Sequence, residues 1–412
     1  MLTKTLAGAI LLWTALSWAD SMFSYWLYRG YNSKDSGEQV EFYTNALAAW
    51  TAGDGPKNKA VAYNSRGLAY HAKMDEDRAI QDFDRAIELR PGYEAAYCNR
   101  GDAFRGKKDY DRAIQDYDKA VKLKPGYEAA YYGRGNTFHE MRAIDRAIRD
   151  YTKALELKPD WEAAFYSRGN AFREKPDIDR AIQDYDVVIE LNPHYAEAYC
   201  ERGIAYGMKK DFQQGLADCA KAIALKPDAA EAYRCRGNIY AEKKDLDKAV
   251  EDFSRAIALK ADDAALYLDR GSAYRLQGDY GRAIADLSRS VALDPGAPRS
   301  YSRLGHCCYE AGKDQDAVDA FVKSLNLHRD PGAWAGLAMA LLRQGHADKA
   351  LSAFRKGVKL EPALAEGAKA VKGKDAYTKG QLKVLDELAG LLKKAAPPPS
   401  PDPGSRKGPP RA

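Results

Sequence analysis

Small and aromatic residues recur along most of the chain at the spacing of one helix face, in blocks of 34 residues. With Ala60 as position 1, positions 4, 8 and 11 of the second block hold Tyr97, Gly101 and Phe104. This is the i, i+4, i+7 spacing of a helix stripe. A second stripe of the same kind passes through positions 20, 24, 27 and 28. Each block therefore predicts two amphipathic helices.

The glycine at position 8 marks the period. It recurs at intervals of 34 residues in eight blocks: Gly67, Gly101, Gly135, Gly169, Gly203, Gly237, Gly271 and Gly305. A ninth block follows a one-residue deletion and has Ala338 in this slot. A polar turn separates the two helices, and position 32 is usually proline, which cannot continue a helix interior. Because neither helix can bury its stripe alone, the blocks are expected to stack on one another.

This pattern resembles the tetratricopeptide repeat (TPR) family over residues 60–364, three quarters of the chain. The resemblance implies an all-α fold, an α–α superhelix in which antiparallel helix pairs stack into a right-handed solenoid. The first helix of each pair would line the concave side. It also implies a non-enzymatic scaffold that binds a protein or peptide segment in the concave groove. We expect nine tetratricopeptide repeats, called copies one to nine below.

Position 7 departs from the family pattern, which commonly has leucine there. It is arginine in copies one to seven and leucine in the last two, and position 23 changes in step from Asp to Ala. Positions that change together are expected to be in contact. Because an Asp beside each Arg neutralises it, we favour structural pairing over an anion-binding stripe. The predicted ion pairs are Arg66–Asp82, Arg100–Asp116, Arg134–Asp150, Arg168–Asp184, Arg202–Asp218, Arg236–Asp252 and Arg270–Asp286.

Helix positions 2, 5, 9, 12 and 13 share the face that lines the groove in tetratricopeptide repeat proteins. In copies two to four this face carries amide, tyrosine and charged side chains, which suit the backbone of an extended peptide. The predicted peptide-binding residues are Asp102, Arg105, Tyr132, Asn136, His139, Tyr166, Asn170 and Arg173, with Glu140 and Glu174 beside them. The alternative is that they form only the polar, solvent-facing side of each helix.

The N-terminus has the features of a secretory signal peptide over residues 1–19. Lys4 is followed by an apolar run over residues 5–19, and small residues precede Asp20. We expect cleavage before Asp20 and a periplasmic or secreted protein. The alternative is a signal anchor, because apolar residues resume at 22–28, and only an uncleaved segment would bring the chain to a membrane. A membrane-anchored assembly factor and a regulatory subunit of an enzyme complex therefore remain open as roles.

The remaining segments flank the copies. Residues 20–59 are expected to hold a degenerate first repeat followed by an inserted loop, GDGPKN. Residues 365–395 include the amphipathic stretch GQLKVLDELAGLLKKA and predict capping helices. The Pro-rich, basic residues 396–412 predict a disordered tail.

The net charge of +5 is concentrated near the C-terminus and does not mark the repeats as basic. Residues 360–412 carry ten basic and six acidic residues, and so account for four of the five excess charges. A nucleic-acid-binding protein should have a basic face along its folded body, so no nucleic-acid partner is expected.

An acidic-peptide clamp known in the family is only partly matched. Arg234, Asn238, Arg299 and Arg303 stand at its basic and amide positions. Asp269 stands where the clamp has a neutral Asn and would repel a carboxylate. The sequence therefore disfavours this clamp.

Cysteine and metal chemistry are weakly indicated. Of six cysteines, only Cys200 and Cys235 are placed for a disulfide. The HCC triplet at 306–308 cannot converge on one ion, since successive helix residues point about 100° apart. Histidines are scattered and Gly-rich phosphate loops are absent. We therefore expect no catalytic residues, no cofactor and no metal.

Overall fold

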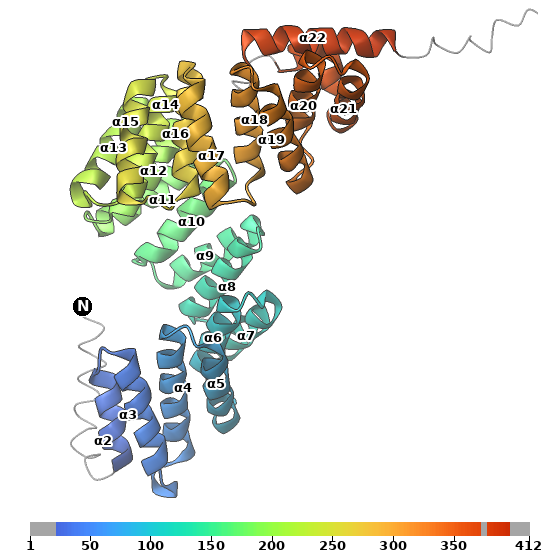
Figure 1. Cartoon of the computed structure of the whole chain (residues 1–412). Coiled ribbons are helices and arrows are strands. Elements are labelled where there is room, and N and C mark those ends of the chain that lie inside the picture. The colour runs from blue at the N-terminus through green and yellow to red at the C-terminus, as the bar shows by residue number, and fades with distance from the viewer. Residues whose placement is uncertain (1–21, 372–376, 396–412) are drawn as a thin grey trace, which may run out of the picture. The chain divides into compact units, whose positions relative to one another are not determined.

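The computed structural model describes residues 22–371 and 377–395, and every regular element within them is a helix. Figure 1 shows consecutive helices joined by short turns. By its contacts the chain divides into two compact units, Met1–Lys209 and Lys210–Ala412. None of the described helices has both the length and the apolar character that crossing a membrane requires.

The first unit contains copies one to four and the first helix of copy five, preceded by two further helices. Its elements are α2 (Met22–Asn32), α3 (Ser36–Ala49), η1 (Ala52–Asp54), α4 (Pro56–Ala72), α5 (Glu76–Leu89), α6 (Glu94–Gly106), α7 (Tyr110–Leu123), α8 (Glu128–Glu140), α9 (Ile144–Leu157), α10 (Glu162–Glu174), α11 (Ile178–Leu191) and α12 (Ala196–Met208).

The second unit starts with the second helix of copy five and continues through copy nine to the C-terminal elements. These are α13 (Phe212–Leu225), α14 (Ala230–Glu242), α15 (Leu246–Leu259), α16 (Ala264–Gln277), α17 (Tyr280–Leu293), α18 (Pro298–Glu310), α19 (Asp314–Leu327), α20 (Pro331–Arg343), α21 (Ala347–Leu360), η2 (Pro362–Val371) and α22 (Lys379–Lys394).

The glycine at position 8 makes room for a ring from the second helix. A Cβ atom on Gly101 of α6 would lie 2.9 Å from Cε1 of Tyr117 in α7, closer than carbon atoms pack. The same ring faces the next copy, where a Cβ on Gly133 of α8 would lie 2.6 Å away. Tyr117 is fully buried as a result, and burial of such a side chain contributes about 2–3 kcal/mol. The ring thus joins both helices of copy two to copy three.

The second helix begins at an aspartate cap in several copies and ends ahead of a proline. In copy two the Asp109 carboxylate accepts the backbone N–H of Arg112, and copies one, four, five and seven have the same cap. Such a cap satisfies a donor that the first turn leaves free and is worth about 1 kcal/mol. α7 ends at Leu123, two residues before Pro125.

The turn inside each copy places position 15 in the left-handed region. In six copies this residue is not glycine. Its φ is 32° at Pro176 and lies between 60° and 66° at the other five: Met74, Lys108, Arg142, Lys210 and Lys244. A side chain in this region costs about 1–2 kcal/mol. The last three copies have glycine here: Gly278, Gly312 and Gly345.

α2 and α3 form a helix pair that is built like the copies that follow it. A Cβ on Gly30 would lie 2.5 Å from the Tyr43 ring, so this pair has its own glycine slot. Phe23 is fully buried in a cluster with Ala46 and Ala62. The predicted GDGPKN loop is wrong in its second half, because α4 already begins at Pro56. The fixed φ of proline suits the first helical turn, where its missing N–H costs nothing.

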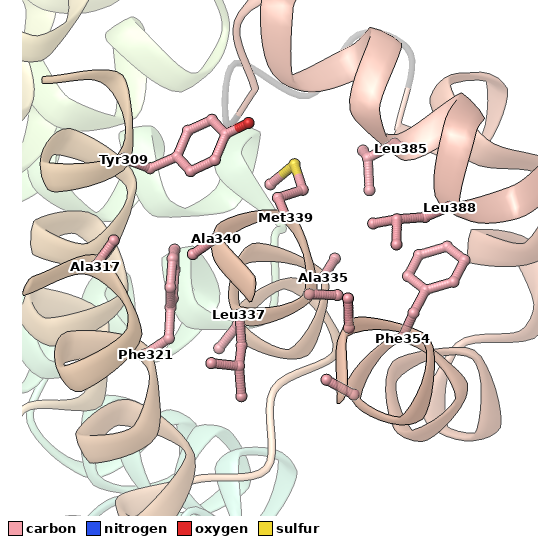
Figure 2. Packing of buried hydrophobic residues seen from close by; sticks show 14 of the residues in the cluster. Tyr309, Ala317, Phe321, Ala335, Leu337, Met339, Ala340, Phe354, Leu385 and Leu388 are labelled. Carbon is pink, nitrogen blue, oxygen red and sulfur yellow. The ribbon is translucent and has the colours of Figure 1, made fainter. Parts of the chain in front are cut away.

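At the other end, α22 packs on the last copy. Figure 2 shows Leu385 and Leu388 of α22 facing Met339 and Phe354, and all four side chains belong to one buried cluster. Thr378 caps α22 and shares a capping box with Gln381. The paired-helix packing described above confirms the predicted all-α solenoid. The predicted signal segment, residues 1–19, and the predicted tail, residues 396–412, lie outside the described residues.

Candidate functional site

Six of the seven predicted Arg–Asp pairs come together in the structure, each inside one copy. Two parallel hydrogen bonds of 2.7–2.9 Å join each guanidinium to its carboxylate: Arg66–Asp82, Arg100–Asp116, Arg134–Asp150, Arg168–Asp184, Arg236–Asp252 and Arg270–Asp286. The hydrogen bonds that Arg134 donates to Asp150 raise the pKa of Arg134, and burial opposes this. Arg202 and Asp218 belong to different units, so that pair stays a prediction.

The same arginines also reach the preceding helix pair, which the sequence reasoning missed. The third guanidinium nitrogen of Arg100 bonds Asp84 over 2.5 Å, and that of Arg202 bonds Asp186 over 2.6 Å. Elsewhere the acceptor is Asp118 or a hydroxyl: Arg134–Asp118, Arg66–Thr44, Arg168–Thr152 and Arg270–Ser254. The signal was present in the sequence, because position 25 is Asp, Thr or Ser in most copies with Arg at position 7.

The aromatic residue at position 4 completes this arrangement. In copies one to seven its ring centroid lies 5.4–5.9 Å from the Cζ atom of the position-7 arginine. This distance is within reach of a cation–π interaction. The position-7 arginines therefore contact acceptors and rings within their own copies, and most of them also bond the preceding copy.

On the predicted groove face, position 9 has a structural role as well. A tyrosine hydroxyl from position 24 donates to its side-chain oxygen at 2.7–2.8 Å: Tyr117 to Asp102, Tyr151 to Asn136 and Tyr185 to Asn170. Tyrosine occurs at position 24 only in these copies, a correlation that the sequence contains and that was overlooked. Since Oδ1 of each Asn faces the tyrosine, its amide nitrogen, a donor of two hydrogen bonds, lies on the other side.

The side chain at position 12 pairs with an acid of the next copy, at position 13 in copies three and four and at position 6 in copy five. Arg105 Nη1 bonds Glu140 Oε1 over 2.7 Å. His139 Nε2 lies 3.2 Å from Glu174 Oε1. In copy four, Arg173 Nε lies 3.1 Å from an oxygen of Glu201 in copy five. Burial raises the pKa of Asp102, and its hydrogen bond from Tyr117 and the charge of Arg105 oppose this. These residues form a continuous charged strip along α6, α8 and α10.

One nitrogen at position 12 of each of these copies lacks a hydrogen bond. Arg105 Nε, His139 Nε2 and Arg173 Nε are shielded from solvent, and none makes a bond of acceptable geometry with a described residue. The ion-pair contacts of His139 and Arg173 are close enough but badly oriented. A buried donor without an acceptor costs about 1–3 kcal/mol. The three nitrogens recur once per copy along the predicted groove.

Two tyrosines of the predicted set flank this strip as partly buried rings. Tyr132 packs against Trp161 with ring centroids 4.6 Å apart. Tyr166 stacks on Tyr195 at 5.3 Å. The Tyr132 hydroxyl lies 3.2 Å from Ser167 Oγ. All eight predicted residues therefore lie on one surface of the first unit, which we call the copy 2–4 strip: Asp102, Arg105, Tyr132, Asn136, His139, Tyr166, Asn170 and Arg173.

The remaining candidates from the sequence, the peptide clamp, the cysteines and a metal site, do not belong to the copy 2–4 strip. Arg234 donates to Asp269 over 2.7 Å, so this arginine is neutralised inside the second unit. All six cysteines are buried. Cys200 and Cys235 belong to different units, so a bond between them stays a prediction. Within the described residues, no group of three or more His, Cys, Asp and Glu side chains is arranged to hold a metal ion.

Comparisons with known proteins agree with this fold. Models described as tetratricopeptide repeat match residues 60–93, 128–160, 200–264, 237–304 and 331–364, and a model described as TPR repeat matches 101–141 and 169–210. No curated protein sequence matches the chain. Matches of this kind along the copies, together with the paired helices, define an all-α helical-repeat protein.

Solved structures similar to the chain include those of three proteins, one of them with a TM-score above 0.5. A tetratricopeptide repeat protein from Parabacteroides merdae ATCC 43184 is 20% identical, with 60% of this chain and 97% of that chain covered and a TM-score of 0.52. YrrB, a TPR protein with an unusual peptide-binding site, is 27% identical over 44% of this chain and 93% of its own, with a TM-score of 0.38. MamA is 29% identical over 39% and 94%, with a TM-score of 0.37. The chain belongs to the tetratricopeptide repeat family, whose members are scaffolds that bind protein or peptide partners.

Proposed function

We propose that the copy 2–4 strip binds an extended protein segment, and that the chain acts as a non-enzymatic scaffold through this surface. The observation that carries the proposal is the row of donors at Arg105 Nε, His139 Nε2 and Arg173 Nε, which are buried and make no hydrogen bond of acceptable geometry with a described residue. An extended segment offers a carbonyl oxygen at every residue and can supply one acceptor to each copy.

Two further features support an extended ligand. The tyrosine hydroxyls hold the side-chain amides of Asn136 and Asn170 in fixed orientations, which lowers the entropy lost on binding. The rings of Tyr132 and Tyr166 are held by their aromatic neighbours and offer rigid contact area. Glu140 and Glu174 contact Arg105 and His139 of the strip. Because these carboxylates offset positive charge on the surface, the ligand does not have to be strongly negative.

Selection of displayed random peptides on the immobilised full-length chain tests the proposal and requires no assumption about the sequence of the partner. We expect enriched peptides to bind the wild type, and to bind an Arg105→Gln/Arg173→Gln variant at least tenfold more weakly. The double substitution removes both guanidinium donors and keeps the tyrosine–asparagine bonds intact. An Asn136→Ala/Asn170→Ala variant should weaken binding further, although it also leaves two tyrosine hydroxyls unpaired.

The matched control is Lys119→Gln/Arg149→Gln, which removes two exposed charges from second helices. Peptides should bind this variant as tightly as the wild type. If no peptide is enriched, or if enriched peptides bind the strip variant and the control equally, the proposed binding surface is wrong.

We also propose that the chain is exported and cleaved before Asp20, which would make it periplasmic or secreted. Cleavage there would leave α2 complete, because this helix starts at Met22 and buries Phe23 in the cluster with Ala46 and Ala62. The anchor alternative needs the apolar segment to extend through residues 22–28, and these residues pack on α3. Mass spectrometry of the mature N-terminus tests this. A start at Asp20 supports cleavage, and a start at Met1 in a membrane fraction contradicts it.

A further inference from the structure

The first helix of a copy packs against the preceding helix pair through positions 3, 6, 7 and 10, which we call the stacking face. At position 6, a Cβ on Gly133 would lie 2.6 Å from the Tyr117 ring of the preceding copy. At position 10, Ala103 packs on the Phe83 ring of the preceding copy. Position 3 is alanine in seven of the nine copies, and position 7 supplies the arginine that bonds the preceding copy. Small residues on this face therefore let consecutive copies approach closely.

The stacking face of α2 carries large side chains instead. Gly30 faces the Tyr43 ring and so corresponds to position 8 of a copy. Positions 3, 6, 7 and 10 of this helix are then Tyr25, Tyr28, Arg29 and Asn32. All four are exposed, and the exposed fractions of the two tyrosines are 48% and 58%. No copy from one to nine has an aromatic residue at position 3 or 6, so these rings would hold a preceding copy of the ordinary kind away from α2.

Among the residues that the structure describes, α2 is the only place where aromatic residues are exposed. They are Tyr25, Tyr28 and Tyr31. At 100° per residue, Tyr31 and the exposed Met22 lie at the two edges of the stacking face. The end of a repeat stack needs a polar outer face to remain soluble by itself. An aromatic end face therefore indicates a partner, and tyrosine, methionine and arginine are enriched in protein interfaces.

The only charged residue of α2, Arg29, is held by groups of its own helix pair. Its Cζ lies 4.6 Å from the centroid of the Phe42 ring, and its Nη1 donates to the Tyr25 hydroxyl over 3.0 Å. Phe42 precedes Tyr43, which fills the glycine slot, and so stands where copies one to seven have aspartate. A cation–π contact thus replaces the Arg–Asp pair here. The face holds no carboxylate or ammonium group whose burial against a partner would be costly.

The charges that follow α2 argue against an anionic lipid surface as this partner. Asp35, Glu38 and Glu41, in the turn after α2 and the first half of α3, are exposed, and Lys34 is the one basic residue among them. Anionic lipids attract basic segments, so this acidic surroundings would be repelled. A protein partner is therefore favoured.

The order of side chains along α2 suits the same helix of a second chain. A two-fold axis midway between Tyr25 and Tyr28 would set two such helices antiparallel, with Tyr25 of each beside Tyr28 of the other. Aromatic rings in such contacts prefer offset or edge-to-face packing. The two Arg29 residues would lie five residues apart, about 7.5 Å along the helix axis. A parallel pair would instead place Arg29 against Arg29, and like charges that face each other in a contact are unfavourable.

We propose that the stacking face of α2 is the contact surface of a homodimer, in which two chains pack antiparallel about a two-fold axis with Tyr25 of each beside Tyr28 of the other. The contact continues the stacking by which the copies themselves pack, and the two-fold axis closes it, so no third chain adds to this face. It shares no residue with the copy 2–4 strip and does not depend on that strip binding a peptide. A dimer carries two such strips, so a partner with two suitable segments would bind it more tightly than it binds one chain.

Sedimentation of the isolated full-length chain over a range of concentrations tests the proposal, with the N-terminus determined by mass spectrometry. We expect a monomer–dimer equilibrium that dissociates on dilution, since one helix per chain makes a small interface. A monomer at every concentration would overturn the proposal, and if its N-terminus is Met1, residues 1–19 become the candidate occupant of the face. Binding of a monomeric chain to phosphatidylglycerol vesicles, if it requires Tyr25 and Tyr28, would also overturn the proposal and identify a lipid-binding helix.

A Tyr25→Ala/Tyr28→Ser variant gives α2 the residues that copy one has at positions 3 and 6. We expect the dissociation constant of the dimer to rise at least tenfold. Because both rings are exposed, the melting temperature of the dilute monomer should change little. The control is Leu68→Ala/Met208→Ala, which removes two exposed apolar side chains from α4 and α12 and should dimerise as the wild type does. Equal affinity of the face variant and the control would contradict the assignment of the contact to α2.

Cysteine cross-linking tests the antiparallel register at a concentration where the wild type is dimeric. The native cysteines are buried, so exposed thiols introduced on α2 should react first. We expect a mixture of Tyr25→Cys and Tyr28→Cys chains to form the mixed disulfide faster than either variant links to itself. Faster linking of each variant to itself would mean that like residues meet, as in a parallel pair, and the proposed arrangement would be wrong.

Discussion

Arg134 and Asp150 face each other edge to edge between α8 and α9, with Nε and Nη2 of the arginine donating to Oδ2 and Oδ1 over 2.7 Å each. The aspartate is buried and the arginine side chain is 18% exposed. In copy nine the same two places hold Leu337 and Ala353, both buried. The contact between the two helices of a copy can therefore be made either by a charged pair or by an apolar pair.

Removing one partner of the Arg134–Asp150 pair should be costly, whereas replacing both partners by apolar residues should not. We expect Arg134→Leu to lower the free energy of unfolding by about 3 kcal/mol, since it leaves the buried Asp150 unpaired. Asp150→Ala should cost less, because Arg134 is partly exposed and keeps its bond to Asp118. The double variant should lose at least 1 kcal/mol less than the sum, because it restores the Leu–Ala pair. Urea unfolding, with hydrogen exchange at α8 and α9 to localise the effect, measures this. Arg149→Leu, at an exposed site, is the control, and strictly additive losses would contradict the expectation.

The two acceptors of Arg100 allow a comparison within one site. Asp116 belongs to the same copy and its side chain is 8% exposed, whereas Asp84 belongs to the preceding copy and is 45% exposed. We expect Asp116→Ala to cost about 3 kcal/mol and Asp84→Ala less than about 1 kcal/mol, because water screens the exposed pair. Only the smaller loss should shrink further in high salt. Equal losses in thermal unfolding would show that the contact between copies is as strong as the contact within one.

The turn at copy two should be stabilised by a single glycine. Lys108 has φ 61°, and its neighbour Lys107 has φ −79°. Lys108→Gly removes the strain of a side chain in the left-handed region, and we expect a gain of about 0.5–1 kcal/mol after the entropy cost of glycine. Lys107→Gly has no strain to relieve and should lose about that amount. Melting temperatures of the two variants, compared with the wild type, should move in opposite directions.

Acid should destabilise the second unit through His306. The folded pKa of His306 is about 3 and the ordinary value is 6.5, so between these values the unfolded chain binds a proton that the folded chain does not. Stability therefore rises with pH in this window and is lost as the pH falls from 6.5 towards 3, by up to about 1.4 kcal/mol per unit. We expect His306→Gln, compared with wild type between pH 7 and pH 4, to lack this part of the slope.

The exposed His328 provides the control for this titration. Its change to Gln should leave the pH dependence of urea unfolding as it is in the wild type. If His306→Gln and wild type lose stability in parallel on acidification, the histidine is not held neutral in the folded state.

The sequence predicted the helix pairs and the arginine–aspartate contacts because both repeat with a fixed period. Gly101 and Tyr117 recur in register, so the pattern itself shows which side of each helix is buried. The GDGPKN loop was misjudged because it occurs once and has no repeat to compare with. A single proline such as Pro56 is equally compatible with a loop and with the first turn of a helix.

The candidate surfaces were less accessible to sequence reasoning. Asn136 and Asn170 were predicted to be groove residues, but their bonds to tyrosines required a second correlation, between positions 9 and 24. The contacts of Tyr377 and Gln381 with His306 could not be predicted, since these two residues follow the last copy and have no counterpart in any other. Contacts between unlike segments leave no periodic trace in a sequence.

The Tyr117 ring fits against a glycine of its own copy and against another glycine of the following one. Position 8 is glycine in copies one to eight, so loss or duplication of a whole 34-residue copy would keep the first of these neighbours, while a change of any other length would set the Cβ of another residue against the ring. The number of copies in this fold can therefore change only in whole periods without filling the space that each ring occupies.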